Sequence, residues 1–386
     1  MPKLFKCFIY IVLFVFFVLL LNKNVPSLTI KQRPPAPNFK KIRILLDMGN
    51  KKFNIVYNSN SPVQVTVDKE LIFNIANRNF TVSNKGNRLQ IGNITIKGKQ
   101  AEFLLLNPDD FFIYKGKKFR RAIKAYIDSS KKVYLTHELP LELYISQVVA
   151  GEMAVNASEE ALKAQAIASR TYCCYNMLER RLLPYDLTLE SQAYKNVPNI
   201  LQAVKETYGK VLTLNGRIIP AFFHTNCGGF TEYSVNVWRT YYHYSKIIEC
   251  PYCKKSKHFS WKVKISYAEI KRSLKKGGYK ISNIRSIYTY SVNPKTHRTT
   301  QIIIKTAVKD LILSANTFRL LIGPKKIKST FFSITNNTNY AEFSGRGYGH
   351  GVGMCQDGAQ EMAKQGFSAE DILLFYFPDT KITTIY

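Results

Sequence analysis

Cysteine and histidine residues stand in two short pairs whose spacing suits a bound metal ion. His224 and Cys227 form a His-x2-Cys pair, and Cys250 and Cys253 form a Cys-x2-Cys pair further along the chain. Thiolate and imidazole ligands together favour tetrahedral Zn²⁺, so these four residues predict a structural zinc site. His258 follows shortly after Cys253 and is an alternative fourth ligand to His224.

The same cysteines fit two other chemistries. In an exported protein they would form one or two disulfides instead. Cys250 and Cys253 also resemble the redox dithiol of glutaredoxins, but that motif needs an early βαβ unit followed by a helix, whereas residues 254–257 lead into a strand-like segment. Cys173 and Cys174 lie within a predicted helix, and we expect them to pack in the core rather than bind metal.

Glu152 is the carboxylate best placed for acid–base chemistry. It follows an apolar segment and stands between Gly151 and Met153. The C-terminus of a helix is electronegative and burial disfavours charge, so both effects would raise the pKa of this carboxyl group. A carboxylic acid still protonated near neutral pH is the proton donor that glycosidic cleavage requires. The alternative is a glutamate exposed at a helix end with no chemical role.

Glycines occupy every second position between residues 345 and 353, with His350 among them. Glycine costs backbone entropy on folding and adds nothing to a core, so this spacing indicates an unusual backbone path or the close approach of a ligand. A glycine-rich surface loop is the alternative. A phosphate cradle is disfavoured because no Gly-Lys-Ser/Thr sequence closes the run, as a P-loop requires.

Along the chain, the sequence predicts strands first and then helices, and these elements must position the residues named above. From residue 42 to about residue 138, short alternating apolar runs are separated by Asn, Gly and Asp turns, which predicts a β-rich domain. Pro140 is expected to open a helix that ends near Glu152. Further along, the pattern predicts strands together with helices at about 267–275, 316–321, 357–365 and 369–375.

A second helix is expected to begin at Ser158, which suits an N-cap. Alanines make this helix slim, so that neighbours can approach closely. Gln165, Ser169 and Tyr172 recur at i, i+4 and i+7 and form a polar stripe on one side. Because an alanine-rich helix is usually buried, we expect this stripe to line a cleft; a solvated surface is the alternative.

The chain is strongly basic. Its 386 residues include 56 lysines and arginines and 26 aspartates and glutamates, which gives a formal net charge of +30 at pH 7. Such a surface attracts polyanions, whether nucleic acid, anionic lipid or acidic polysaccharide, although a general bias toward Lys and Asn is an alternative explanation. No recognisable nucleic-acid-binding module accompanies the charge, which argues against a role with DNA or RNA.

Residues 1–24 predict export, either as a signal peptide or as an N-terminal membrane anchor. Lys3 and Lys6 precede an apolar run at 7–21, which at ~1.5 Å per residue spans about 22 Å, short of the ~30 Å hydrocarbon core. This length suits a signal peptide, but no Ala-x-Ala cleavage pattern follows, so an uncleaved membrane anchor is the alternative. Residues 25–41 contain a proline-rich stretch that predicts a stiff linker.

Several motifs together resemble the stage II sporulation protein D and amidase-enhancer family. They occur in the family's order over roughly residues 40–386, at 139–153, 160–172, 223–232, 237–238, 328–331, 345–358 and 376–378. The chain departs from the family pattern at five positions within or directly beside these motifs, namely Leu143, Ala154, Tyr348, Cys355 and Asp357, where Cys355 stands for the usual serine.

The resemblance implies an α+β fold and a cell-wall activity. A β-rich N-terminal domain at 42–138 would pack on a mixed α/β catalytic domain at 139–386, which carries the Cys/His residues, the glycine-rich motif and a substrate groove. The implied activity is that of an exported lytic transglycosylase, located in the periplasm or cell envelope. Such an enzyme cuts peptidoglycan glycan strands between N-acetylmuramic acid and N-acetylglucosamine and leaves 1,6-anhydro ends; the family's sporulation members prefer strands stripped of their peptides by an amidase.

Glu152 matches the family's catalytic glutamate. As an acid it would protonate the leaving glycosidic oxygen, and as a base it would take the proton from the 6-hydroxyl that attacks the anomeric carbon. The resemblance implies sugar contacts from six further residues, namely Gln165, Arg170, Tyr172, Gly349, His350 and Gln356. Peptide-stripped strands expose lactyl carboxylates, which the basic surface of this chain would attract.

Other functions remain as alternatives. The first is a non-catalytic, glycan-binding enhancer of a cell-wall amidase, and a membrane protein is a further possible partner. The second, a nucleic-acid binder, is undercut by the predicted export. The third is an exported dithiol oxidoreductase that uses Cys250 and Cys253.

Overall fold

The computed structural model describes residues 39–50, 52–67, 70–154, 156–193, 195, 197 and 200–386, which belong to one compact unit, Asn38–Tyr386. The predicted signal or anchor at 1–24, and the predicted linker at 25–41 except for its last three residues, lie outside the described residues. Within the described part of the chain, no helix is both long enough and apolar enough to span a bilayer.

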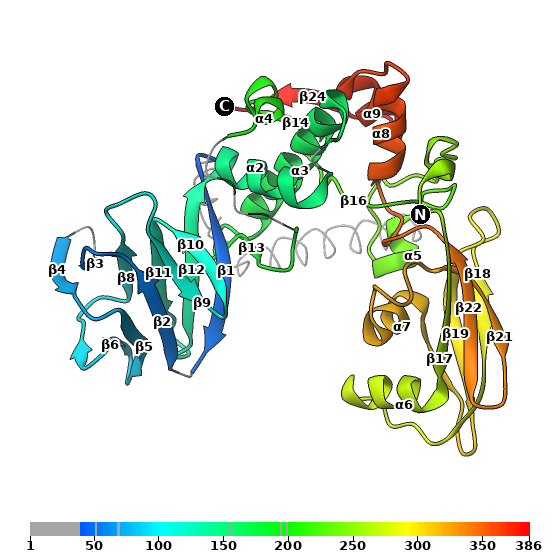
Figure 1. Cartoon of the computed structure of the whole chain (residues 1–386), viewed down its shortest axis with the longest axis horizontal. Helices are drawn as coiled ribbons and strands as arrows, with labels where there is room; N and C mark the ends of the chain where they lie inside the picture. Colours follow the sequence, from blue (N-terminus) through cyan, green and yellow to red (C-terminus); the bar gives the residue numbers. More distant parts are fainter. Residues whose placement is uncertain are drawn as a thin grey trace, which may run out of the picture. The chain divides into compact units, whose positions relative to one another are not determined.

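Two mainly antiparallel sheets make up the N-terminal part, as the alternating apolar runs predicted (Figure 1). One sheet has the strand order β13-β1-β12-β11-β8-β3-β4, in which β13 pairs in parallel with β1, and the other has the order β10-β9-β2-β5-β6-β7. The strands are β1 (Lys41–Gly49), β2 (Phe53–Asn58), β3 (Val63–Val67), β4 (Glu70–Ile75), β5 (Asn79–Lys85), β6 (Arg88–Ile91), β7 (Ile94–Thr95), β8 (Gln100–Leu104), β9 (Phe111–Tyr114), β10 (Lys117–Arg120), β11 (Ala122–Ile127), β12 (Val133–Pro140) and β13 (Leu187–Thr188).

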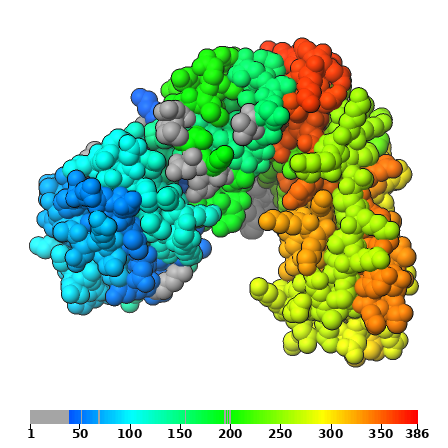
Figure 2. Space-filling model, in the orientation of Figure 1, coloured from blue at the N-terminus to red at the C-terminus, as the bar shows by residue number. Residues whose placement is uncertain are grey.

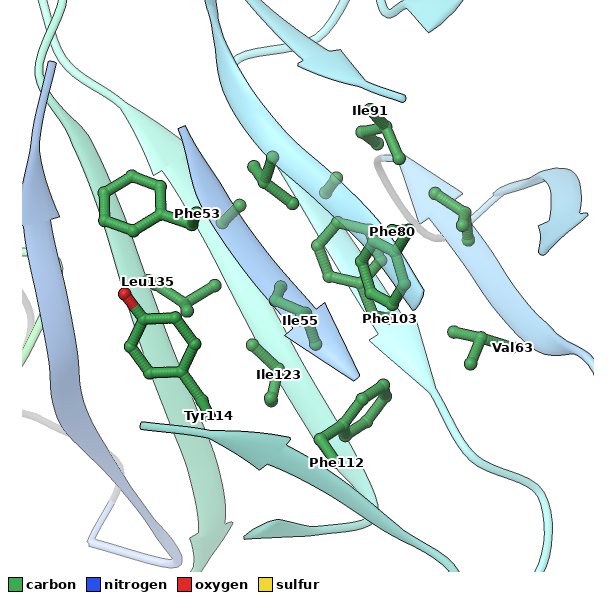
Figure 3. Close-up of a cluster of buried hydrophobic side chains, with 14 of the residues drawn as sticks. Phe53, Ile55, Val63, Phe80, Ile91, Phe103, Phe112, Tyr114, Ile123 and Leu135 are labelled. Carbon is green, nitrogen blue, oxygen red and sulfur yellow. The ribbon is translucent and has the colours of Figure 1, made fainter. Parts of the chain in front are cut away.

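The facing sides of these sheets form one apolar core (Figure 3). Phe53 and Ile55 point inward from β2, where buried and exposed residues alternate along the strand. Phe103, Ile123 and Leu135 meet them from the other sheet, and all five side chains are buried. The β-rich N-terminal region expected from the sequence is therefore confirmed.

Helices α2 (Leu141–Glu152) and α3 (Glu159–Glu179) follow directly, and they contact each other. Pro140 ends β12 and is the N-cap of α2, where its missing N–H removes no helix hydrogen bond. Ser158 stands at the N-cap of α3, as expected, but its hydroxyl bonds to Gln360 rather than to a helix N–H.

Helices α8 (Gln356–Lys364) and α9 (Ala369–Tyr376) lie against α3, as Figures 1 and 2 show. Helix α4 (Gln202–Glu206) also contacts α3, as does β14 (Lys210–Leu214). Strand β14 pairs with β15 (Arg217–Ile218) and with the last strand, β24 (Lys381–Thr384). The sequence predicted both closing helices but not the strand that follows them.

Residues 260–346 form a smaller α+β region with its own apolar core. Its sheets are β17-β22-β21 and β18-β19-β20, and helices α6 (Tyr267–Lys276) and α7 (Ala315–Ile322) begin with side-chain caps from Ser266 and Ser314. These strands are β17 (Ser260–Ser266), β18 (Ile284–Val292), β19 (Thr299–Thr306), β20 (Leu311–Ser314), β21 (Phe331–Asn336) and β22 (Tyr340–Arg346). Both helices were predicted, because their caps and apolar periodicity are local signals.

Four short elements complete the description. Strand β16 (Phe223–His224) pairs in parallel with β23 (Met354–Cys355), directly before α8. Helix α5 (Ser234–Trp238) and the 3-10 helix η1 (Tyr252–Lys255) lie between β16 and β17 in the chain. The β16–β23 pair joins two segments that are more than a hundred residues apart in the sequence.

Candidate active site

A pocket of about 600 Å³ lies between the end of α2, one side of α3 and the glycine-rich segment. The chain segments around β16, α5 and the start of α8 complete its wall. The described residues that line it are Glu152, Tyr172, Ser191, Gln192, Phe222, Phe223, His224, Thr225, Trp238, Tyr242, Arg319, Tyr348, Gly349, His350 and Gln356. Among these lining residues, Glu152 is the only carboxylate.

Glu152 is the last residue of α2 and is held by two hydrogen bonds. The backbone N–H of Ala193 donates to Oε1 over 2.7 Å, and the side-chain amide of Gln356 donates to Oε2 over 3.2 Å. Burial raises the pKa of Glu152 above its usual value, and the two donors reduce that rise without cancelling it. The carboxyl group therefore favours the protonated form more than an exposed glutamate does.

Gln356 is fixed in turn by the polar stripe of α3. Its amide also lies 3.3 Å from Oε1 of Gln165, whose own amide donates to Ser169 Oγ over 2.9 Å. Gln165 is completely buried and does not line the pocket. The expected sugar contact from Gln165 is thus corrected: this residue stands behind Gln356 and orients its amide toward Glu152.

Arg170 is also corrected, because its side chain points away from the pocket. Its guanidinium is completely buried and forms a two-pronged ion pair with Glu142, with N–O distances of 2.8 and 2.6 Å. It also donates to the carbonyl of Lys210. The reason is helical geometry: position 170 faces α2 and β14, whereas Tyr172 lines the pocket beside Phe222, with ring centroids 5.8 Å apart.

Two neutral histidines form the wall near the glycine-rich segment. The backbone N–H of Val352 donates to Nδ1 of His350, and the Val352 carbonyl accepts from Nδ1 of His224, each over 3.1 Å. Burial lowers the pKa of His224 to about 3, with help from the charge of Arg298, and it lowers the pKa of His350 as well. The Nε2 atom of His224 is buried and has no hydrogen-bond partner among the described residues. It is therefore an unused acceptor in the pocket wall.

Aromatic rings surround this pair. The ring centroid of His350 lies 4.9 Å from that of Trp238 and 5.5 Å from that of His224. Phe222 contacts Trp238 with a centroid distance of 4.5 Å and Tyr242 with one of 5.6 Å. A pocket with aromatic faces, one carboxyl group and a few polar atoms is suited to a polar organic ligand with flat apolar faces, such as a sugar.

The glycine-rich segment takes the unusual path that its spacing indicated. Gly353 has φ +72°, and a Cβ there would lie 2.1 Å from the carbonyl oxygen of Phe222. Gly349 has φ +116°, and a Cβ there would lie 2.7 Å from the Cβ of His224. Side chains at these positions would separate the segment from β16, so the glycines allow the pocket wall to close.

Four buried cysteines gather beside the pocket, and we call them the cysteine cluster: Cys227, Cys250, Cys253 and Cys355. Their sulfur atoms all lie within 4.8 Å of one another. Three of the four were predicted as ligands. The fourth is Cys355 rather than His224, because His224 lies in β16 with its ring in the pocket wall and bonded to Val352.

The other histidine and cysteines considered from the sequence also lie outside the cluster. His258 points its Nδ1 at Asp357 Oδ2, 3.3 Å away. Cys173 and Cys174 are buried in the core around α2 and α3, as expected. The departure of Cys355 from the usual serine of the glycine-rich motif was the one signal in the sequence that could have identified the fourth cysteine.

Comparison of the sequence with known proteins identifies related families. The family model described as stage II sporulation protein matches residues 129–214, which include Glu152, and a domain of unknown function (DUF8618) matches residues 244–353. Stage II sporulation protein D of Bacillus subtilis is 30% identical over 266 residues, which are 64% of this chain and 75% of that protein.

Two further relatives extend the comparison. An uncharacterised protein of Brachyspira hyodysenteriae is 29% identical over 318 residues, covering 80% of this chain and 83% of that protein. The amidase enhancer of Bacillus subtilis is 27% identical over 292 residues, which are 61% of this chain but 40% of that protein. The chain belongs to the stage II sporulation protein D and amidase-enhancer family.

Proposed function

We propose that this chain is a lytic transglycosylase that cleaves peptidoglycan glycan strands, with Glu152 as both general acid and general base. Membership of the family assigns the chain to cell-wall biology. The observation that carries the finer proposal is the isolation of Glu152: it is the one carboxylate among the described pocket residues, and burial raises its pKa.

The reaction needs a single carboxyl group. Protonated Glu152 gives its proton to the glycosidic oxygen as the bond from that oxygen to the anomeric carbon breaks. The resulting carboxylate takes the proton of the 6-hydroxyl on the same muramic acid, whose oxygen bonds to the anomeric carbon. Glu152 ends protonated, and the product is a 1,6-anhydro sugar. Hydrolases that activate water or form a covalent intermediate need a second carboxylate, and the described lining of this pocket has none.

Other pocket residues supply recognition in this proposal. Trp238, Phe222 and Tyr242 offer flat faces to sugar rings. Arg319 also lines the pocket; burial lowers its pKa to about 10, so it stays charged at neutral pH. Its positive charge suits the lactyl carboxylate of a muramic acid that has lost its peptide.

The proposal includes export to the periplasm or cell envelope, which rests on the basic and apolar N-terminal sequence. It also includes dependence on a cell-wall amidase, since peptide-stripped strands carry the free carboxylates that a chain of net charge +30 attracts. A membrane protein is a further partner consistent with an uncleaved anchor.

The second candidate is a non-catalytic enhancer that binds glycan and stimulates an amidase. One relative carries the name amidase enhancer, and that name is the observation in its favour. In this case the pocket would bind glycan without cleaving it, and Glu152 would be dispensable for stimulation.

Mass spectrometry of glycan products distinguishes the two candidates. Amidase-treated peptidoglycan is incubated with wild-type protein and with Glu152→Gln, which keeps the size of the side chain but carries no transferable proton. We expect anhydro-muramyl ends from the wild type and none from Glu152→Gln. Absence of these ends from both, together with equal stimulation of an added amidase by both, would replace the transglycosylase with the enhancer.

A further inference from the structure

The cysteine cluster has the donor set and spacing of a closed metal site. All four side chains are completely buried, and the Sγ atoms of Cys227 and Cys253 lie 3.4 Å apart. A disulfide bond would need about 2.05 Å, whereas four sulfurs bonded at about 2.3 Å to a tetrahedral zinc ion lie about 3.8 Å apart. The observed packing fits the second arrangement.

Backbone and hydroxyl hydrogen-bond donors lie beside two of the four sulfurs. The backbone N–H groups of Cys227 and Gly358 point at Cys355 Sγ, at 3.2 and 3.4 Å. The hydroxyl of Tyr376 lies 3.2 Å from Cys250 Sγ. Cys355 is also the N-cap of α8, whose positive end favours a negative sulfur. Such donors are the usual outer partners of metal-bound thiolates.

A buried cation stands beside the cluster as well. Arg298 is almost fully buried and donates from Nη2 to the carbonyl of Cys227 over 2.5 Å. Its Nε and Nη1 have no hydrogen-bond partner among the described residues. A buried, underbonded guanidinium is unfavourable unless negative charge lies close by. The buried carboxylate of Glu232 supplies part of that charge, and four thiolates around one Zn²⁺, with a net charge of −2, add to it.

We propose that Cys227, Cys250, Cys253 and Cys355 bind one structural zinc ion, and that this ion fixes the part of the pocket wall that carries Gln356 and His224. The site is closed, because all four ligand positions are filled by thiolates and no position is left for water or substrate. Its role is therefore positional. This inference stands on the geometry of the cluster and holds whether or not the pocket cleaves glycan.

The link to the pocket follows from the chain path. Cys355 is directly followed by Gln356, which donates to Glu152. Cys227 comes just after β16, which carries His224. Cys227 and Cys250 bound the segment that carries Trp238 and Tyr242, both of which line the pocket. One ion thus holds three separate parts of the pocket wall.

Metal analysis of the purified chain tests the site directly. We expect one zinc per chain in the wild type and a small fraction of that in Cys355→Ala. Cys174→Ala is the matched control, because it removes another fully buried cysteine outside the cluster and should keep one zinc. A metal-free folded wild type would overturn the proposal, as would stoichiometric iron, or an intact mass that shows the four thiols joined in two disulfides.

Cobalt substitution keeps the test decisive if Cys355→Ala fails to fold. The wild-type chain is stripped with a chelator and refilled with Co²⁺, whose intense visible bands report tetrahedral geometry and whose ultraviolet charge-transfer bands report thiolate ligands. The proposal expects both signals at one Co²⁺ per chain. Octahedral cobalt without thiolate bands would contradict it.

Hydrogen exchange then tests the positional role. After zinc removal, peptides that cover 223–230 and 350–358 should exchange faster, while β11, in the core of the N-terminal sheets, should not change. Unchanged exchange in both segments of a metal-free chain would show that the ion does not hold the pocket wall.

Discussion

Gln356 donates a hydrogen bond from Nε2 to Oε2 of Glu152 over 3.2 Å, although 204 residues separate them in the chain. The same amide lies 3.3 Å from Oε1 of Gln165, so its orientation is fixed from behind. Glu152 ends α2, Gln165 belongs to α3, and Gln356 begins α8. A residue from the far end of the sequence therefore lowers the pKa of the candidate acid, and substitution of Gln356 removes that contact.

Gln356→Ala should move the alkaline limb of activity to higher pH. The amide of Gln356 lowers the pKa of Glu152, so its removal lets burial raise that pKa further. A general acid with a higher pKa stays protonated to higher pH. The measurement is kcat/KM against pH for the wild type and the variant.

Gln360→Ala is the matched control for that comparison. Gln360 lies one turn further along α8 and bonds to Ser158 rather than to Glu152. Its variant should keep the wild-type pH profile. The proposed role of Gln356 fails if both variants show the same profile as the wild type.

Glu152→Gln should raise the free energy of unfolding at neutral and alkaline pH. Burial raises the pKa of Glu152, so its folded pKa lies above its unfolded pKa. Stability from such a group is fully present below the unfolded pKa and is lost as the pH rises through the folded pKa. The advantage of the variant should thus grow with pH and vanish in acid, as measured by denaturant unfolding at several pH values.

Glu138→Gln provides the opposite case. Burial acts to raise the pKa of Glu138, but the charges and hydrogen bonds of Lys124 and Lys41 lower it overall. Stability from Glu138 is present above its unfolded pKa and is lost as the pH falls through the folded pKa. The variant should be less stable than the wild type at neutral pH, with a deficit that disappears in acid. Parallel pH trends for the two variants would contradict the burial of Glu152.

Arg170→Met should reduce stability without changing the chemistry of the pocket. The variant leaves Glu142 buried without its ion-pair partner, which costs about 3–5 kcal/mol. The double variant Arg170→Met/Glu142→Leu should recover most of this loss, because it leaves neither charge unpaired. Thermal unfolding measures the loss, and KM of the folded fraction should stay at the wild-type value. A raised KM would contradict this structural role and would support the sugar contact that the sequence suggested for Arg170.

Gly353→Ala should disrupt folding more than Gly366→Ala. Both glycines have positive φ, which costs alanine about 1–2 kcal/mol. At Gly366 no other atom lies within 4 Å of an added Cβ, but at Gly353 the carbonyl of Phe222 lies 2.1 Å away. We expect a total loss of about 2–5 kcal/mol at Gly353. Equal loss of unfolding free energy in the two variants would mean that the glycine-rich segment does not approach β16 so closely.

Much of the fold could be predicted because its signals are local. Alternating apolar residues indicated strands such as β2, and the sequence pattern indicated helices at about 267–275 and 316–321, where α6 and α7 lie. The position of Glu152 at the end of α2 could also be predicted, since the apolar helix before it and the family motif around it occupy consecutive residues. The closing strand β24 was missed because its partner β14 lies far away in the sequence.

The surroundings of individual site residues could not be predicted in the same way. Arg170 is structural because Glu142, on another helix, faces it. Cys355 completes the cysteine cluster because β23 pairs with β16, a contact that no local pattern reveals. In both cases the role depends on which distant segment packs against the residue, and sequence spacing carries no information on that.

The most direct test of the proposed activity is cleavage of peptide-stripped glycan strands in H₂¹⁸O, with products analysed by mass spectrometry. Attack by the 6-hydroxyl uses no water, so the wild type should release 1,6-anhydro ends that contain no ¹⁸O. Glu152→Gln should release none, with a rate loss of at least about 10²-fold. Reducing ends labelled with ¹⁸O, or undiminished cleavage by Glu152→Gln, would contradict the assignment of this chain as a lytic transglycosylase with Glu152 as its acid and base.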